Sequence, residues 1–272
     1  MVDIKLYGYS TSPYVRKVAC CLYYKQLPFE FVPVNPVDPS GIAFSGQTQV
    51  PVLQIGDESR IDSTPLALWL DELFPERPLF GQNEEEKQAI LEMDQWVSNS
   101  LILSGFRSVH EARMSARLRH MAWRLVSVVS SQTPVADEVR NAWPALLQTA
   151  PFIKHMMCDI DKSESASEMR GRVGMQLIEN LKDGPFFGGR SEPSLVDFAI
   201  FPQIVFSYAI GIEDELLPAQ IPVVRDWLGR ILKYMPENPL LAPDYMIVNP
   251  LSQMLETSTE RSTQIAGTVP AA

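Results

Sequence analysis

The hydrophobic period changes repeatedly within residues 3–73, and this succession constrains the fold more than any other feature of the chain. Residues 3–7 alternate as a short strand does, and residues 12–24 then carry apolar side chains at the spacing i, i+3, i+4, i+7 of a helix. Alternation returns in "LPFEFVPVN" and stops at Pro33, which predicts a second strand. Because a helix joins them, the two strands are expected to run parallel in a βαβ unit.

The next part of the chain predicts two more strands and a helix. A loop rich in Pro, Gly and Ser spans residues 35–45. Two short strands then flank a turn at Gly56 and Asp57, and Ser63 is placed to cap the helix that follows. Pro65 is tolerated in the first turn of that helix. Its apolar face consists of Leu66, Leu70 and Leu73.

From Asn83 onward the pattern is helical throughout. Ser194 and Asp197 stand three residues apart as in a capping box, which we assign to folding rather than to chemistry. Shorter helices are expected to break at Pro144 and Pro151. The predicted helices cover residues 84–104, parts of 135–161, 165–181, 194 onward and 223–234.

Composition and charge limit the classes of function. The chain has 272 residues, of which 46% are hydrophobic and 21% charged, so a sizeable core is expected. A net charge of -10 argues against nucleic acid as a partner, because phosphate binding needs a basic face. There is no long apolar run and no basic leader, so we expect a cytoplasmic protein with no membrane partner. The three cysteines and three histidines lack ligand spacing, so no metal site is predicted.

Four stretches of sequence, spread over most of the chain, carry a resemblance to a known family. They are "STSPYVRKV", "QVPVL", "DSTPLALWLDELFP" and "GPFFGGRSEPSLVDFAIFP". With the order of elements, they make the sequence similar to the cytosolic glutathione transferases. The resemblance implies an α/β thioredoxin-like N-terminal domain at residues 1–80, followed by an all-α C-terminal domain at 81–250 with a pocket for an electrophile. Residues 251–272 are expected to be a polar C-terminal tail, unstructured or laid over the surface. The resemblance also implies a homodimer and a role in detoxification.

Ser12 is the candidate catalytic residue. Glutathione reacts as a thiolate, and a hydroxyl at a helix N-terminus can stabilise that anion by a hydrogen bond. Ser12 precedes Pro13, where the resemblance implies the thiolate-stabilising Ser of the serine-type transferases. Ser10, Thr11 and the tyrosines Tyr7 and Tyr9 stay open as rivals, and a plain helix N-cap stays open as another interpretation of Ser12.

The glutathione-binding residues that the resemblance implies lie in two segments. "QVPVL" resembles the family's cis-proline loop, in which a cis bond before Pro51 turns the backbone of Val50 toward the peptide ligand. Gln49 is placed to reach the glycyl carboxylate. In "DSTP", Ser63 and the first-turn N–H groups suit the γ-glutamyl carboxylate, and Asp62 suits its ammonium group.

The second half departs from the family pattern. The interval before the capping box is longer than is usual for the family, so the electrophile pocket is the least predictable part. Phe106, Arg107, His110 and Arg113 are placed either to line that pocket with positive charge or to form a solvated face with one packed aromatic.

The resemblance implies a glutathione-dependent transferase that acts on a small hydrophobic electrophile. Isomerisation, ether cleavage and dehalogenation share the same thiolate and stay open as reaction types. A non-catalytic binding or scaffold protein of the same fold is the alternative from another class. A thiol reductase is disfavoured, because that chemistry needs a cysteine at or near residue 12 and none is present there.

Overall fold

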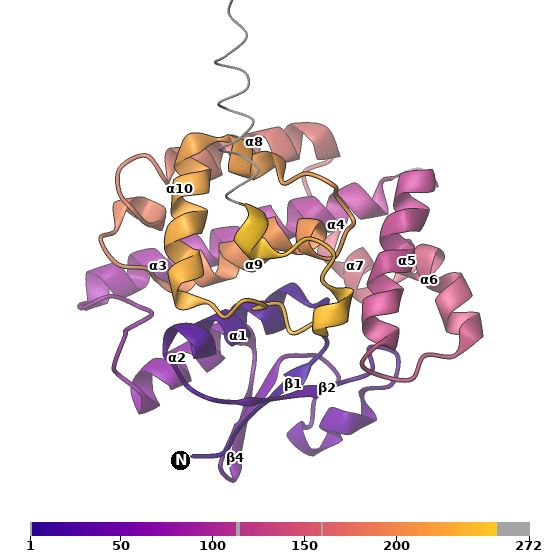
Figure 1. Cartoon of the computed structure of the whole chain (residues 1–272), viewed down its shortest axis with the longest axis horizontal. Helices are drawn as coiled ribbons and strands as arrows, with labels where there is room; N and C mark the ends of the chain where they lie inside the picture. The colour runs from indigo at the N-terminus through magenta and orange to yellow at the C-terminus, as the bar shows by residue number, and fades with distance from the viewer. Residues whose placement is uncertain (1, 113–114, 159, 255–272) are drawn as a thin grey trace, which may run out of the picture.

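A computed structural model describes residues 2–112, 115–158 and 160–254 of the 272-residue chain. It contains a four-stranded sheet with two helices, α1 (Pro13–Tyr24) and α2 (Ser63–Leu73), joined to a larger helical part (Figure 1). This is an α/β thioredoxin-like N-terminal domain followed by an all-α C-terminal domain, as the sequence predicted.

The sheet has the order β2-β1-β3-β4. Its strands are β1 (Ile4–Gly8), β2 (Glu30–Pro33), β3 (Val52–Ile55) and β4 (Glu58–Ile61). Strand β1 pairs parallel with β2 and antiparallel with β3. The predicted βαβ unit is therefore confirmed. Helices α1 and α2 share one hydrophobic core with Ile4, Leu6 and Leu53, whereas Val52 packs in a smaller cluster on the other face of the sheet.

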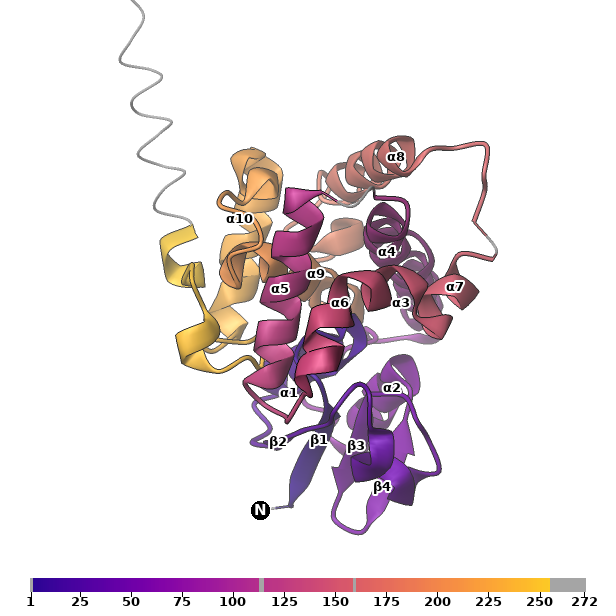
Figure 2. The same cartoon turned by 90° about the vertical axis from the view of Figure 1, so that its right-hand side faces the viewer.

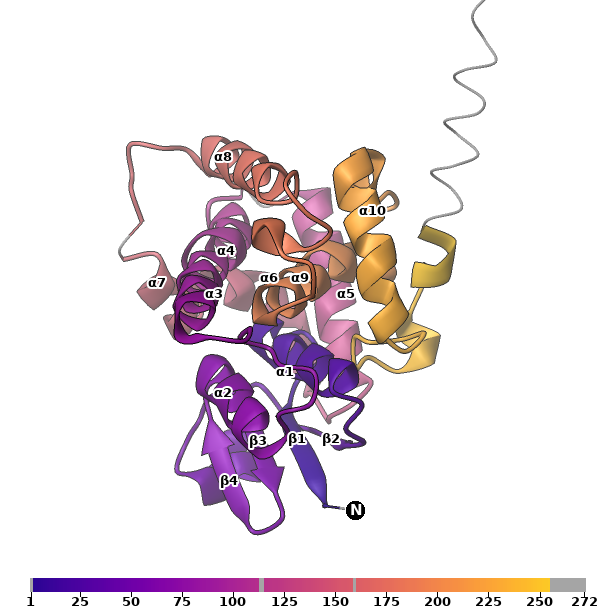
Figure 3. The same cartoon turned by 90° about the vertical axis from the view of Figure 1, so that its left-hand side faces the viewer.

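The remaining helices wrap around α9 (Leu195–Ala209), which is buried along most of its length (Figure 3). Such an apolar helix is expected at the centre of a helical domain. It contacts α1 directly, so α1 lies between the sheet and the helical domain (Figure 2). The others are α3 (Glu84–Trp96), α4 (Leu103–His110), α5 (Ala116–Ser130), α6 (Asp137–Thr149), α7 (Pro151–Met156), α8 (Ala166–Glu179) and α10 (Pro222–Ile231).

Short helical turns connect these elements. A π-helix at Val97–Ile102 joins α3 to α4. The 3-10 turns are Pro39–Ser45, Phe187–Gly189, Leu217–Gln220, Leu232–Tyr234 and Asp244–Met246. The first of them corrects the prediction of a plain loop at residues 35–45: the Asp38 side chain accepts the N–H of Ser40, and Ile42 is fully buried.

The helical domain differs from the sequence prediction in three places. Helix 84–104 continues to His110, through a π-helix whose ends, Val97 and Ile102, are both buried five residues apart. Pro144 does not break α6, because the neighbouring Trp143 is anchored in a hydrophobic cluster against α5. Helix α5 was not predicted, although its buried face recurs at helical spacing. That face includes Leu118, Ala122, Val126 and Val129. Of the predicted polar C-terminal tail, residues 251–254 are helical with Leu251 and Met254 buried, and residues 255–272 lie outside the described residues.

The predicted capping box at the start of α9 is confirmed and buried. The Asp197 carboxylate accepts the Ser194 N–H (2.8 Å) and hydroxyl (3.2 Å), the Phe187 N–H (3.0 Å) and the Trp227 indole N–H (2.7 Å). Burial raises the pKa of Asp197, while these donors favour its charged form. The carboxylate thus ties three segments of the helical domain together.

We expect Asp197→Ala to lower the free energy of unfolding by about 3–5 kcal/mol, because it leaves several buried donors without an acceptor. Ser165→Ala, at the exposed capping box of α8, is the matched control and is expected to cost about 0.5–2 kcal/mol. Urea unfolding followed by circular dichroism measures both. Equal losses in the two variants would contradict the role given to Asp197.

Candidate active site

Ser12 caps α1 at the end of the loop that follows β1. Its Oγ accepts the N–H of Val15 at 3.4 Å, and Pro13 occupies the first helical position. The residue is 4% exposed. Its hydroxyl hydrogen has no acceptor within the described part of the chain. The cap therefore uses the oxygen of Ser12 and leaves the proton available to an anion at the helix N-terminus.

The rival hydroxyls are engaged differently. Ser10 is fully buried and donates its proton to Gln132 Oε1 at 2.6 Å. The Tyr7 hydroxyl donates to Gln54 Oε1 at 2.8 Å. Burial raises the pKa of Tyr9. Thr11 is half-buried and stays a rival. The geometry thus favours Ser12 over Ser10 and Tyr7 as a donor to an external thiolate.

The bond between Val50 and Pro51 is cis. Pro51 is buried directly before β3, Val50 is half-buried, and Gln49 is exposed. The backbone N–H and C=O of Val50 make no hydrogen bond to any other described residue. A peptide ligand can therefore pair with Val50 as a neighbouring strand would.

The start of α2 lies one residue earlier than predicted. Ser63 is the first helical residue, and the N-cap is Asp62, whose C=O accepts the N–H of Leu66 at 2.9 Å. Asp62 is exposed, has φ 69° and makes no capping bond with its own side chain. This backbone turn puts the cap one position before the serine, so the prediction of Ser63 as N-cap was wrong. The carboxylate of Asp62 is left facing solvent.

The strand register brings the predicted segments to one end of the sheet. Tyr7 of β1 pairs with Val52 of β3, and Val52 pairs with Ile61 of β4. Pro51 directly precedes Val52 and Asp62 directly follows Ile61, so both lie just beyond the same rung. The loop to Ser12 leaves β1 at this end as well. The three predicted segments are therefore neighbours.

A buried ion pair fixes α2 against its neighbours and was not predicted. Lys17 Nζ of α1 lies 2.7 Å from Asp94 Oδ2 of α3 and 2.9 Å from Thr64 Oγ1 in the first turn of α2. The Thr64 hydroxyl donates to the same Asp94 oxygen at 2.6 Å. The sequence did contain one indication of this buried pair: Asp94 lies at helical spacing between the apolar residues Ile90 and Val97, which are both buried.

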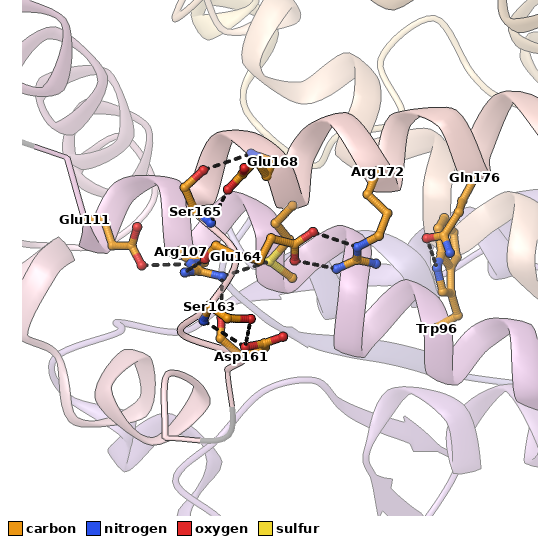
Figure 4. Close-up of polar contacts among 11 residues, drawn as sticks. Trp96, Arg107, Glu111, Asp161, Ser163, Glu164, Ser165, Glu168, Arg172 and Gln176 are labelled. Atoms are coloured by element: carbon orange, nitrogen blue, oxygen red, sulfur yellow. Dashed lines mark hydrogen bonds and ion pairs between the residues drawn. The ribbon is translucent and has the colours of Figure 1, made fainter.

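Arg107 is buried, so it does not lie on a solvated face. It is 3% exposed, pairs with Glu111 at 2.8 Å, and donates to the carbonyls of Asp161 (3.2 Å) and Glu164 (Figure 4). It thus holds the segment before α8. His110 Nδ1 lies 2.9 Å from the Gln148 carbonyl, and Arg113 lies outside the described residues.

Two surface hollows lie away from the predicted site. The first, of about 460 Å³, lies between the end of α1 and β2 and includes Tyr23, Phe29 and Leu241. The second, of about 230 Å³, includes Trp123 and Arg140. Neither is lined by any of the predicted site residues, so neither hollow identifies the binding place of an electrophile.

Cys20 and Cys21 are buried, whereas Cys158 is exposed. Burial raises the pKa of the Cys20 thiol, and that of Cys21 to about 12, so both stay protonated near neutral pH.

Across the ranges that the structure describes, no group of three or more His, Cys, Asp or Glu side chains is arranged to hold a metal ion. Within the same residues, no helix has the length and apolarity needed to span a bilayer.

Comparisons with known proteins show which proteins the chain resembles. Residues 6–78 match the family described as "Glutathione S-transferase, N-terminal domain". Prostaglandin E synthase 2 of Mus musculus is 25% identical over 92% of this chain and 73% of its own length. Glutathione S-transferase Z1 of Arabidopsis thaliana is 31% identical over 38% of this chain and 47% of its own length, so the match spans about half of that relative.

A solved structure shares the fold. The crystal structure of a glutathione S-transferase from Rhodospirillum rubrum F11 has a TM-score of 0.58 at 17% identity, covering 89% of this chain and 97% of that chain. A thioredoxin-like domain followed by a helical domain is thus the class that the fold defines. Residues 6–78 are similar to the N-terminal domain of the glutathione S-transferases, and the whole fold is similar to that of a solved glutathione S-transferase.

We expect Asp94→Ala and Lys17→Met each to lower the free energy of unfolding by about 3–5 kcal/mol, because each leaves a buried charge without its partner. The double variant is expected to cost less than the sum by more than about 1 kcal/mol. Lys87→Met, which removes the exposed pair with Glu84, is the control and is expected to cost less than about 1 kcal/mol. Additive single losses would show that the pair does not act as a unit.

Proposed function

We propose that the protein is a glutathione-dependent transferase in which Ser12 stabilises the glutathione thiolate for attack on a small hydrophobic electrophile. The observation that carries the proposal is the free hydroxyl hydrogen of Ser12 at the N-terminus of α1. It lies at the end of the sheet that also holds the cis bond before Pro51 and the start of α2.

The proposed binding mode uses backbone groups as well as side chains. The cysteinyl part of glutathione pairs with the free N–H and C=O of Val50. The γ-glutamyl carboxylate binds Ser63 and the first N–H groups of α2, where the helix dipole favours an anion, and its ammonium group binds Asp62. Gln49, which is exposed, reaches the glycyl carboxylate.

The free energies of the interactions involved support the proposal that one serine at a helix N-terminus is enough to stabilise the glutathione thiolate. Lowering the thiol pKa from about 8.5 to about 6.5 needs about 2.7 kcal/mol. A hydrogen bond to a charged group contributes about 1.5–3 kcal/mol, and a helix N-terminus adds about 0.3–1. The thiol proton leaves to solvent, the sulfur forms a bond to the electrophilic carbon, and the leaving group departs with its electron pair. Ser12 donates a hydrogen bond and is not a nucleophile.

The same site serves other reactions of the thiolate. Isomerisation, ether cleavage and dehalogenation begin with the same activated sulfur, so the electrophile decides among them. The alternative is a non-catalytic binding or scaffold protein, which the low exposure of Ser12 favours. By family resemblance we also propose a cytoplasmic homodimer with one site in each subunit and a role in detoxification.

We expect Ser12→Ala to shift the rising limb of the pH–activity profile upward by roughly 1–2 pH units, because losing a charge-assisted bond of about 1.5–3 kcal/mol raises the thiol pKa. Affinity for glutathione is expected to stay within about tenfold. The absorbance of bound thiolate near 240 nm, followed against pH, measures the same shift directly.

Ser10→Ala is the matched control, since the Ser10 hydroxyl is bonded to Gln132, and we expect the pH midpoint to stay in place. If Ser10→Ala, Thr11→Ala or a tyrosine change shifts the midpoint instead, the assignment of Ser12 is wrong. Retention on immobilised glutathione without any thiolate signal would favour the scaffold protein.

A further inference from the structure

Arg16 differs from the other buried cations of the protein. The buried cationic side chains among the described residues are Arg16, Lys17, Lys25 and Arg107. Lys17 pairs with Asp94 at 2.7 Å, Lys25 with Asp71 at 2.6 Å, and Arg107 with Glu111 at 2.8 Å. Arg16 has no carboxylate within 4.0 Å anywhere in the described chain. Its charge is therefore uncompensated.

The contacts of Arg16 are all with neutral groups. Nη1 donates to the Ser10 carbonyl at 2.9 Å, Nη2 donates to Gln203 Oε1 at 3.0 Å, and Cζ lies 3.8 Å from the centre of the Phe206 ring. Nε is buried and has no partner among the described atoms. Burial lowers the pKa of Arg16 to about 9, so the side chain is still charged near pH 7. Keeping an unpaired charge in the interior is costly.

The location of this charge is next to the proposed thiolate site. Arg16 lies one turn into α1 and donates its backbone N–H to the Ser12 carbonyl at 3.2 Å. Its guanidinium holds the carbonyl of Ser10, two residues before Ser12. The positive charge of Arg16 and the partial positive charge of the helix N-terminus have the same sign, so both favour an anion at the N-terminus of α1.

We infer that Arg16 is the buried counter-charge of the glutathione thiolate, the anion that the protein itself does not supply. The inference rests on the proposed function. Because Nη1 and Nη2 are already bonded to the Ser10 carbonyl and to Gln203, we give Arg16 no direct contact with the ligand: it is a positioning residue that acts through its field and through the Ser10 backbone. It adds to the hydrogen bond of Ser12, and a charge in the interior acts over a longer distance than one in water.

The test measures the pKa of the bound thiol from the absorbance near 240 nm, with glutathione as the probe. We expect Arg16→Gln to raise the midpoint of the thiol titration by about one pH unit and Arg16→Lys to raise it by less. Affinity for S-methylglutathione, whose sulfur cannot ionise, is expected to change by less than about twofold.

A second variant keeps the test decisive if Arg16→Gln does not fold. Gln203→Glu keeps the Arg16 side chain and puts a carboxylate against its guanidinium, at the position of an existing 3.0 Å contact, while it also removes the hydrogen bonds that Gln203 donates to the Pro13 and Ala199 carbonyls. We expect the midpoint to rise as in Arg16→Gln. Arg107→Gln is the control: it removes a buried guanidinium that holds the segment before α8, so it should lower stability but leave the midpoint in place.

The outcomes separate this inference from the proposed function. If glutathione binds and Ser12→Ala shifts the midpoint, but neither Arg16→Gln nor Gln203→Glu shifts it, Arg16 has a structural role alone and the inference is overturned. If the unmodified protein binds no glutathione, the proposed function fails and the inference fails with it. A shift that Arg107→Gln reproduces would also overturn it.

Discussion

Helix α1 is packed on one side against the sheet and on the other against α9, and the position of the candidate site depends on this burial. A helix enclosed in this way cannot place its long cationic side chains in water. Each of them is instead fixed by a specific partner: Arg16 by Gln203, Lys17 by Asp94 and Lys25 by Asp71.

These contacts connect the two domains around the loop before α1. Gln203 of α9 also donates to the carbonyl of Pro13, and Gln132 accepts the Ser10 hydroxyl while donating to the Leu241 carbonyl at 2.7 Å. The loop that carries Ser12 is thus held by side chains of the helical domain. A thiolate is stabilised best by a donor that is already oriented and lies in a water-poor environment, and this loop meets both conditions.

The sequence predicted the N-terminal domain well, because its strands and helices are short, strongly periodic and separated by Pro or Gly. It also predicted the buried capping box of α9 from Ser194 and Asp197 alone. Helix α5 was not predicted, although its apolar residues recur at helical spacing. The predicted break at Pro144 is absent because Trp143, packed in a hydrophobic cluster, keeps α6 intact. Local patterns do not reveal such long-range packing.

The segments of the candidate site were predicted by resemblance, and the register of β1, β3 and β4 explains why they meet. The cis bond before Pro51 was expected from the same resemblance and is present. The partners of Lys17 and Arg16 could not be predicted, because Asp94, Thr64 and Gln203 lie far from them in the chain and come close only in the folded protein.

The most direct test of the central claim is the number of protons released when glutathione binds, measured by calorimetry at pH 7 in two buffers of different ionisation enthalpy. If the bound thiol has a pKa near 6.5 instead of about 8.5, binding releases about 0.7 proton per site. S-methylglutathione is expected to release none. Binding of glutathione without proton release would contradict the claim that Ser12 and the start of α1 hold a thiolate.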